Sequence, residues 1–352
     1  MTIAILPHLV IGVLPVLAFL AALLYLDGYK LVTMRVIAAV VLTGVVVAGV
    51  CYYANGWLIG VVSLDFTNYS RYVSPWVEEL AKGLVIVALI RMHRIGFLVD
   101  AAIFGFAVGT GFAIVENVYY QHLVPGAGIG TWIVRGFGTA IMHGGATAIF
   151  AVLGLAIGER TPEPSPVAFI PGLALAVLLH SAFNHLSASP RLALLAIFFT
   201  LPPLLFMVFQ RSERAVAGWL GQGFDADADM LESITSGGFP DSPAGRYLTT
   251  LKRRFKGPVV ADLLCYLRLH AELALRAKGI LMMRENGFEA TVDESIRSKL
   301  EEMRYLERSI GKAGRLALKP LLQDGNKEIW QLRMLESESA SSDGSSAAGA
   351  AK

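Results

Sequence analysis

Long apolar stretches in the first 210 residues constrain the fold more than any other feature of this sequence. A helix needs about 20 mostly apolar residues to cross a bilayer. Seven stretches are candidates, and they cover residues 3–26, 36–56, 72–92, 96–121, 131–158, 167–188 and 191–210. Residues 1–210 are therefore predicted to form an all-α, polytopic membrane helix bundle of about seven transmembrane helices.

Charged residues divide the chain into two parts. Residues 1–210 carry 9 Lys/Arg and 8 Asp/Glu, whereas residues 211–352 carry 21 and 20. The second part is therefore predicted to be a soluble, mostly helical extension, which excludes a secreted or purely cytosolic enzyme. The formal charge of the whole chain is +2, which argues against a nucleic-acid partner.

Composition subdivides the soluble extension further. Residues 211–250 contain Gly, Pro, Ser and Asp and are predicted to be a linker, with alternating aspartates that read as a loop. Residues 251–335 are predicted to be helical, and the Ser/Ala/Gly-rich residues 336–352 to be disordered. One face of a predicted helix is apolar and comprises Val292, Ile296, Leu300, Met303, Leu306 and Ile310. This stripe predicts packing within the extension or on another protein, and a homodimer through these helices is one form of the second.

Basic residues in the short loops predict the orientation in the membrane, because Lys and Arg favour the cytoplasmic side. An N-terminus outside and a C-terminal region in the cytoplasm place more of them inside than the reverse does. The inside loops then hold Lys30, Arg35, Arg91, Arg94 and Arg160.

Ionisable and amide side chains interrupt four of the predicted spans. Such a charged residue in mid-span costs about 2.5–3.5 kcal/mol on insertion scales. These side chains are therefore expected to meet one another, water or an ion inside the bundle. They are Glu78, Glu79 and Lys82 in 72–92, Glu116 and Asn117 in 96–121, His143 in 131–158, and His180 and Asn184 in 167–188.

Helical spacing limits what these groups can do. Lys82 lies three and four residues after the two glutamates, so either carboxylate can pair with it. His180 and Asn184 lie four apart on one helix face, where an imidazole and an amide could stabilise an oxyanion. Carboxylates and imidazoles together suit acid–base chemistry or a divalent metal. A proton-coupled transporter and a non-catalytic membrane scaffold are the alternatives, because buried Glu, Lys and His also occur in transport pathways.

Glycines at four-residue spacing in 96–121 predict close approach between helices. Gly105 and Gly109 form one such pair, within the segment Gly105–Gly111 that precedes Glu116. Tight backbone packing there would hold a polar site rigid.

The polar residues form motifs that resemble those of the PrsW family of intramembrane proteases, which is similar to the CAAX-protease and bacteriocin-immunity superfamily. Glu78-Glu79-Leu80-Ala81-Lys82 matches its EExxK motif. The stretch from Phe112 to Glu116 matches its FxxxE element, including the following Asn117, and the stretch from His180 to Asn184 matches its HxxxN element. With His143 between the last two, the motifs keep the family's order over roughly residues 70–190.

The resemblance implies hydrolysis of peptide bonds inside the membrane. Glu79 or Glu78 would activate the water, Glu116 and His143 would complete the water or metal site, and Lys82 would tune the carboxylates. His180 and Asn184 would stabilise the oxyanion, with Asn117 in support. A divalent metal, zinc by its ligand types, would be held by Glu79, Glu116, His143 and His180.

The resemblance also implies a setting for this activity. The partner would be a membrane-anchored protein substrate, such as an anti-sigma factor or a similar single-span protein. The location would be the bacterial cytoplasmic (inner) membrane, with the protein as a multi-pass component of the lipid bilayer.

Overall fold

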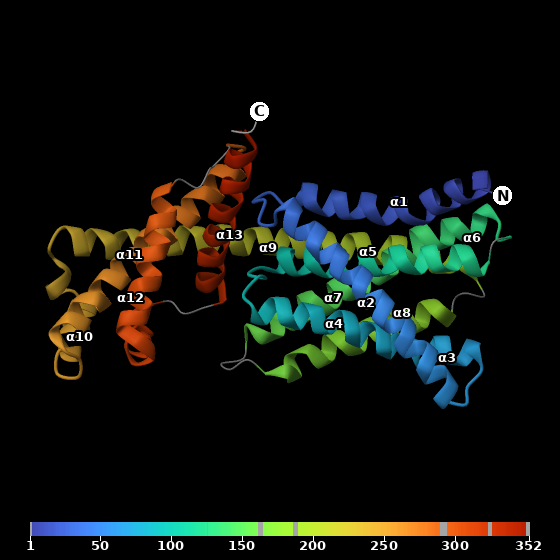
Figure 1. Cartoon of the computed structure of the whole chain (residues 1–352), viewed down its shortest axis with the longest axis horizontal. Coiled ribbons are helices and arrows are strands. Elements are labelled where there is room, and N and C mark those ends of the chain that lie inside the picture. Colours follow the sequence, from blue (N-terminus) through green and yellow to red (C-terminus); the bar gives the residue numbers. More distant parts are fainter. Residues whose placement is uncertain are drawn as a thin grey trace. The chain divides into compact units, whose positions relative to one another are not determined.

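A computed structural model of the chain describes residues 2–124, 126–160, 165–185, 189–288, 294–322 and 326–349 (Figure 1). Helices make up 87% of the described residues, and none of these residues lies in a strand. It divides into two compact units, Met1–Glu213 and Arg214–Lys352, each described by itself below. The predicted all-α class is confirmed.

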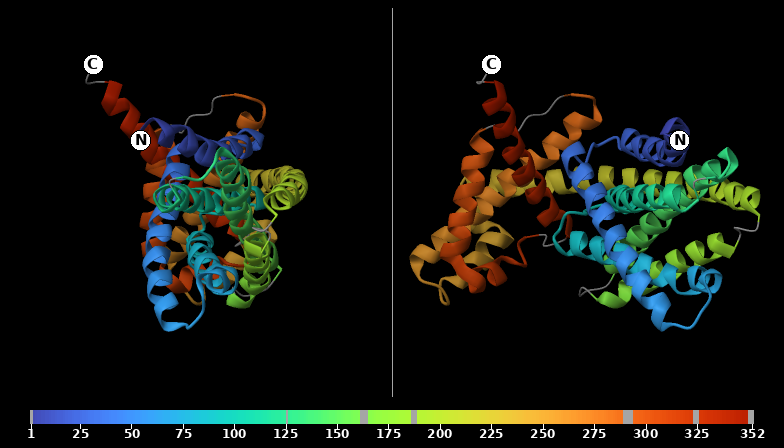
Figure 2. Two further views of the ribbon diagram at one scale, coloured as in Figure 1. Left: turned by 90° about the vertical axis from the view of Figure 1, so that its right-hand side faces the viewer. Right: turned by 45° about the vertical axis from the view of Figure 1, so that its right-hand side comes forward.

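Helices of the first unit gather into a bundle, seen nearly end-on in the left view of Figure 2. In the part of the chain that the structure describes, six helical segments are long and apolar enough to cross a membrane: Pro7–Leu26, Met34–Val61, Leu98–Leu123, Ile129–Gly158, Pro166–His185 and Leu192–Thr235. In element terms the unit contains α1 (Thr2–Leu26), α2 (Met34–Val61), α3 (Phe66–Tyr72), α4 (Ser74–Arg91), α5 (Leu98–Leu123), α6 (Ile129–Val134), the π-helix η1 (Arg135–Ala140), α7 (Ile141–Gly158), the 3-10 turn η2 (Pro166–Phe169), α8 (Ile170–His185) and the first part of α9 (Pro190–Thr235).

The third predicted span, residues 72–92, is not among these six. Helix α4 forms there, but its 18 residues include four charged ones, namely Glu78, Glu79, Lys82 and Arg91. Two of these, Glu79 and Lys82, are buried inside the unit. The prediction of about seven membrane helices therefore corresponds to six apolar helices plus α4, whose polar face is covered by its neighbours.

Helix α5 lies at the centre of the bundle, and glycines bring its neighbours close. A Cβ on Gly105 would lie 2.6 Å from the Ala148 Cα of α7, and one on Gly109 would lie 2.3 Å from the His143 carbonyl oxygen. Real Cβ atoms essentially never approach so closely, so only glycine allows this α5–α7 contact. The close approach predicted for this pair is confirmed, and it brings α7 to α5 at the level of His143.

A proline in α1 allows this helix to pack closely against the same bundle. Pro15 has no N–H, so the Ile11 carbonyl one turn earlier lacks its helical donor. Gly136 of η1 packs there, since a Cβ on it would lie 2.0 Å from the Ile11 oxygen. On the adjacent carbonyl, Asn117 donates its amide to Gly12 O at 2.7 Å. Helix α1 is thereby fixed against α5 and η1.

The second unit is also helical. It contains the remainder of α9, the turn η4 (Phe239–Asp241), α10 (Pro243–Leu251), α11 (Gly257–Glu285), α12 (Glu294–Leu318) and α13 (Asn326–Gly349). The described residues of the predicted apolar stripe, Ile296, Leu300, Met303, Leu306 and Ile310, are all buried on α12, which packs against α11. Of the two kinds of packing predicted for this stripe, packing within the extension is the one observed. Val292 lies outside the described residues.

Two segments of the extension differ from the sequence interpretation. The segment expected to be a linker over 211–250 is helical as far as Thr235, so its aspartates lie on α9 and not in a loop. Val216 and Leu220 of this segment are buried in the second unit, which gives the helix an apolar face. The segment expected to be disordered, 336–352, is helical as far as Gly349, and its alanines are good helix formers.

Candidate active site

A buried ion pair on α4 is the innermost part of the polar cluster. Lys82 is fully buried and Glu79 is 2% exposed. The Lys82 ammonium donates to Glu79 Oε1 at 2.6 Å, so Glu79 is the carboxylate that pairs with this lysine. The same ammonium lies 3.1 Å from His143 Nδ1 of α7. An ion pair this deep is stable only if its hydrogen bonds are satisfied, and the neighbouring helices supply the partners.

His180 of α8 reaches the same carboxylate from the other side. Its Nδ1 donates to Glu79 Oε1 at 2.8 Å. The proton is therefore on Nδ1, and the lone pair of Nε2 is directed elsewhere. Nε2 lies 3.9 Å from Glu78 Oε2. A carboxylate that holds one ring nitrogen so that the other is presented in a fixed direction is the arrangement found behind metal-bound histidines.

Glu78 is oriented by polar residues from three helices. Its Oε1 accepts from Ser74 Oγ at 2.5 Å and from Asn55 Nδ2 of α2 at 3.2 Å. Tyr69 of α3 in turn donates its hydroxyl to Asn55 Oδ1 at 2.9 Å. With Oε1 held in this way, Oε2 is the oxygen that faces His180.

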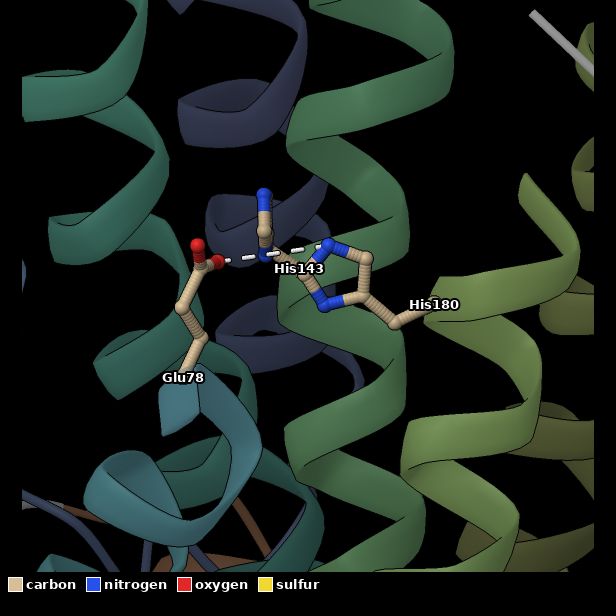
Figure 3. A group of neighbouring side chains, drawn as sticks. All are labelled: Glu78, His143 and His180. Carbon is tan, nitrogen blue, oxygen red and sulfur yellow. Dashed lines mark ion pairs between the residues drawn. The ribbon is translucent and has the colours of Figure 1, made fainter. Parts of the chain in front are cut away.

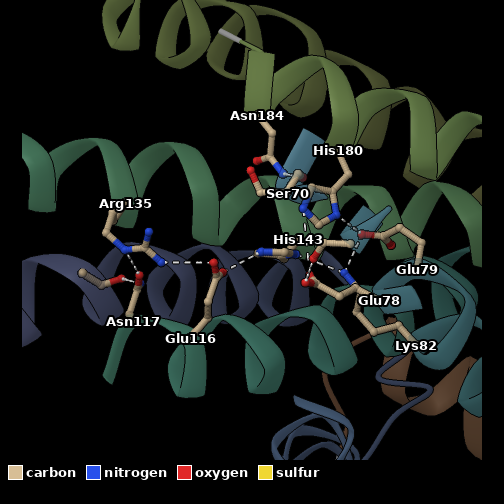
Figure 4. Close-up of polar contacts among 12 residues, drawn as sticks. Ser70, Glu78, Glu79, Lys82, Glu116, Asn117, Arg135, His143, His180 and Asn184 are labelled. Atoms are coloured by element: carbon tan, nitrogen blue, oxygen red, sulfur yellow. Dashed lines mark hydrogen bonds and ion pairs between the residues drawn. The ribbon is translucent and has the colours of Figure 1, made fainter. Parts of the chain in front are cut away.

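Glu116 of α5 does for His143 what Glu79 does for His180. His143 Nε2 lies 2.8 Å from Glu116 Oε2, and the other carboxylate oxygen lies 3.3 Å from the Arg135 guanidinium. Arg135 Nε donates to Asn117 Oδ1 at 2.8 Å, and its guanidinium stacks on the Tyr120 ring at 3.7 Å. Figure 4 shows the resulting row of contacts from Asn117 through Arg135, Glu116 and His143 to Lys82.

The amide of Asn184, predicted to stabilise an oxyanion, binds a backbone carbonyl in this structure. Its Nδ2 donates to the Ser70 carbonyl at 2.8 Å, and Ser181 on the same helix donates to the Arg71 carbonyl at 2.7 Å. Both carbonyls belong to the last turn of α3, and the residue four positions after Arg71 is Pro75, which has no N–H. Asn184 thus links α8 to α3 in the arrangement observed.

One group of side chains has the proximity that a metal requires, and within the described residues it is the only one. Ligand atoms of Glu78, His143 and His180 all lie within 4.8 Å of one another (Figure 3). One carboxylate and two imidazoles form a ligand set that suits zinc. The predicted set named Glu79 and Glu116 in place of Glu78. In the structure, those two carboxylates bind the outer sides of the histidines and pair with Lys82 and Arg135.

The charges of the cluster also favour a cation. The cluster contains three carboxylates, Glu78, Glu79 and Glu116, and two basic side chains, Lys82 and Arg135. The residues present therefore fit a divalent metal by ligand type, by proximity and by charge.

A comparison with protein families identifies the chain. The model of the family described as PrsW family intramembrane metalloprotease matches residues 32–209, just over half of the chain. The chain belongs to the PrsW family. Neither a curated protein nor a solved structure matches the chain. Membership of the PrsW family supports intramembrane protease activity in a multi-pass membrane protein.

Several residues of this PrsW-family site were not found by sequence reasoning. Asn55 lies inside α2, Tyr69 in the short helix α3 and Ser74 at the start of α4, and none of them belongs to a motif. Arg135 belongs to none of the sequence motifs described above. Its place at the start of a π-helix, between Glu116 and Asn117, depends on tertiary contacts that no local pattern reveals.

Proposed function

We propose that this PrsW-family protein is an endopeptidase that hydrolyses peptide bonds of membrane-anchored proteins at the cluster formed by Glu78, His143 and His180. The observation that carries the proposal is the convergence of these three side chains, from α4, α7 and α8, within 4.8 Å inside a bundle of apolar helices. A buried Glu/His cluster of this kind is expected where water must be activated in an apolar setting.

Glu78 is the residue to which we assign the proton transfers. Its Oε2 faces the cluster while Oε1 is held by Ser74 and Asn55. In this position it orients the attacking water, accepts the proton that the water loses, and returns it to the leaving amine. Glu79 is less suited to this role because its Oε1 already binds both Lys82 and His180.

Glu78, His143 and His180 would also hold a divalent metal, with Glu79 and Glu116 fixing the two imidazoles from outside. Glu78 Oε2 would then serve as a ligand, and the proton transfers assigned to it above belong to the site without a metal. When bound, such a metal supplies Lewis-acid chemistry, which polarises a carbonyl group and activates water. Asn184 is proposed as the donor to the oxyanion of the substrate. One N–H of its amide binds the Ser70 carbonyl in the structure, and the other N–H would donate to the oxyanion.

We further propose a single-span protein, an anti-sigma factor or one similar to it, as the substrate. The location would be the bacterial inner membrane. With α4 counted as crossing the membrane, seven helices would put the two termini on opposite sides. The basic residues of the short loops support an N-terminus outside and a C-terminal unit in the cytoplasm. A homodimer through the C-terminal helices stays a prediction, for which cross-linking of the full chain is the test.

The decisive experiment compares membrane proteomes of cells that express the wild type, Glu78→Gln or Glu301→Gln, with new N-termini mapped by mass spectrometry. Glu301 is an exposed carboxylate of α12 and serves as the matched control. We expect a membrane protein to be cut at or near its span by the wild type and the control and to stay intact with Glu78→Gln. Equal cleavage by all three would exclude Glu78 from the chemistry, and no cleavage by well-inserted wild type would contradict the proposed activity.

A further inference from the structure

We propose that Lys82 competes with metal for His143. Its ammonium donates a hydrogen bond to the lone pair of His143 Nδ1, and metal can bind this nitrogen only after Lys82 has moved away from it. The inference rests on the metal site of the proposed function and adds what controls loading of that site. It assigns Lys82 a role beyond pairing with Glu79.

The contact with Lys82 determines which ring nitrogen of His143 carries the proton. A protonated lysine has three donors and no acceptor, so at 3.1 Å His143 Nδ1 must be the acceptor. The ring proton is then on Nε2, which donates to Glu116 Oε2 at 2.8 Å. Both ring nitrogens of His143 are therefore engaged, and its single lone pair is occupied by Lys82 (Figure 4).

The two histidines of the metal trio differ in this respect. His180 donates its Nδ1–H to Glu79, and its Nε2 faces Glu78. A histidine binds a metal through the lone pair of a nitrogen, and one lone pair cannot serve an ammonium and a metal together. Among the three candidate ligands, His143 is thus the one that must exchange a partner.

Lys82 can make that exchange without becoming an isolated buried charge. Its 2.6 Å contact with Glu79 is independent of His143, and its ammonium also lies 4.7 Å from the centre of the Phe112 ring. A rotation of the flexible side chain can withdraw the ammonium from His143 while Glu79 still holds it. The simpler alternative is that Lys82 serves only as the counter-ion of Glu79, in which case its removal leaves the metal affinity unchanged.

The test measures the affinity of the purified full-length protein for Zn²⁺, by competition with a chromogenic chelator and by metal content after desalting. Lys82→Met removes the ammonium. Glu79→Gln/Lys82→Met removes the ammonium and one carboxylate, so the net charge of the site stays that of the wild type. Lys278→Met is the matched control, because Lys278 is a lysine buried to the same degree in the other unit.

We expect the Zn²⁺ dissociation constant to fall about tenfold to a hundredfold in Lys82→Met, since a charge-assisted hydrogen bond no longer competes. The charge-neutral double variant should show the same direction of change, and it decides the matter if the single variant fails to fold. The control should bind as the wild type does.

Unchanged or weaker Zn²⁺ binding in the Lys82 variants, beside a wild type that binds, would overturn the role of Lys82 and leave the metal site intact. If neither the wild type nor the Lys82 variants bind Zn²⁺, the metal part of the proposed function is overturned together with this inference.

Discussion

The buried pair of Glu79 and Lys82 allows a quantitative test of how the core of the site is stabilised. Both side chains are 1% exposed or less, and their charged atoms are 2.6 Å apart. Removal of one partner from a buried pair leaves an uncompensated charge and costs about 3–5 kcal/mol. For a unit of this size 1 kcal/mol corresponds to about 2–4 °C, so Glu79→Gln and Lys82→Met should each lower the unfolding temperature by roughly 6–20 °C.

The double variant measures how strongly the two side chains depend on each other. With both charges removed, no buried charge of this pair is left uncompensated. We therefore expect Glu79→Gln/Lys82→Met to be more stable than either single variant, with a coupling energy of about 2 kcal/mol or more. Additive losses, within about 0.5 kcal/mol, would refute the reasoning, because they would show that the two side chains do not depend on each other.

Two cysteines provide the assay. Cys51 lies in the first unit and is 2% exposed, whereas Cys265 in the second unit is exposed. In a Cys265→Ser background, a thiol-reactive dye therefore reports only the unfolding that uncovers Cys51. The measurement is the temperature at which this thiol becomes reactive in the detergent-solubilised full-length protein.

Three further predictions address other parts of the molecule. Asn55→Ala should lower kcat about tenfold to a hundredfold with little change in KM, because Glu78 loses an orienting donor. In a cleavage assay with the identified substrate, a rise in KM with unchanged kcat would contradict this. Gly109→Ala should destabilise the first unit by about 1–3 kcal/mol, while Gly49→Ala, where a Cβ meets nothing within 4 Å, should not, as read from the Cys51 assay. Burial lowers the pKa of His270 in the second unit from 6.5 to about 4, so the unfolded chain binds the proton more readily than the folded one. The free energy of unfolding should therefore fall by about 3 kcal/mol as the pH drops from about 6.5 to 4, and this loss should be absent in His270→Gln. Unfolding temperatures that fall equally with pH in both proteins would contradict this.

The membrane part was predictable because its strongest patterns are local. Length and hydropathy identify apolar helices, and the spacing of Glu79 and Lys82 on one helix predicts their contact. The choice between Glu78 and Glu79 was not predictable in this way. It depends on Asn55 and Tyr69, which reach Glu78 from other helices, and on Lys82 and His180, which occupy Glu79.

The extension was harder to predict because packing there overrides local propensity. Gly223 reads as a linker residue, yet it lies inside α9 where a Cβ would come 2.8 Å from Lys278 Cε. Asp227, which reads as a loop residue, pairs with the buried Lys278 ammonium at 2.5 Å. A glycine and an aspartate are both poor helix formers in isolation. In α9 the glycine leaves room for the buried lysine of α11, and the aspartate pairs with its charge.

The charged face of α4 imposes an order on the biogenesis of this protein. Translation delivers α4 before α7 and α8, which carry the histidines that complete the contacts of Glu79 and Lys82. Until those helices have been made, α4 would expose its charged side chains to hydrocarbon at a cost of about 2.5–3.5 kcal/mol each. Stable integration of α4 therefore has to follow the synthesis of α8. The residues that we propose to form the active site are thus also residues on which the integration of α4 depends.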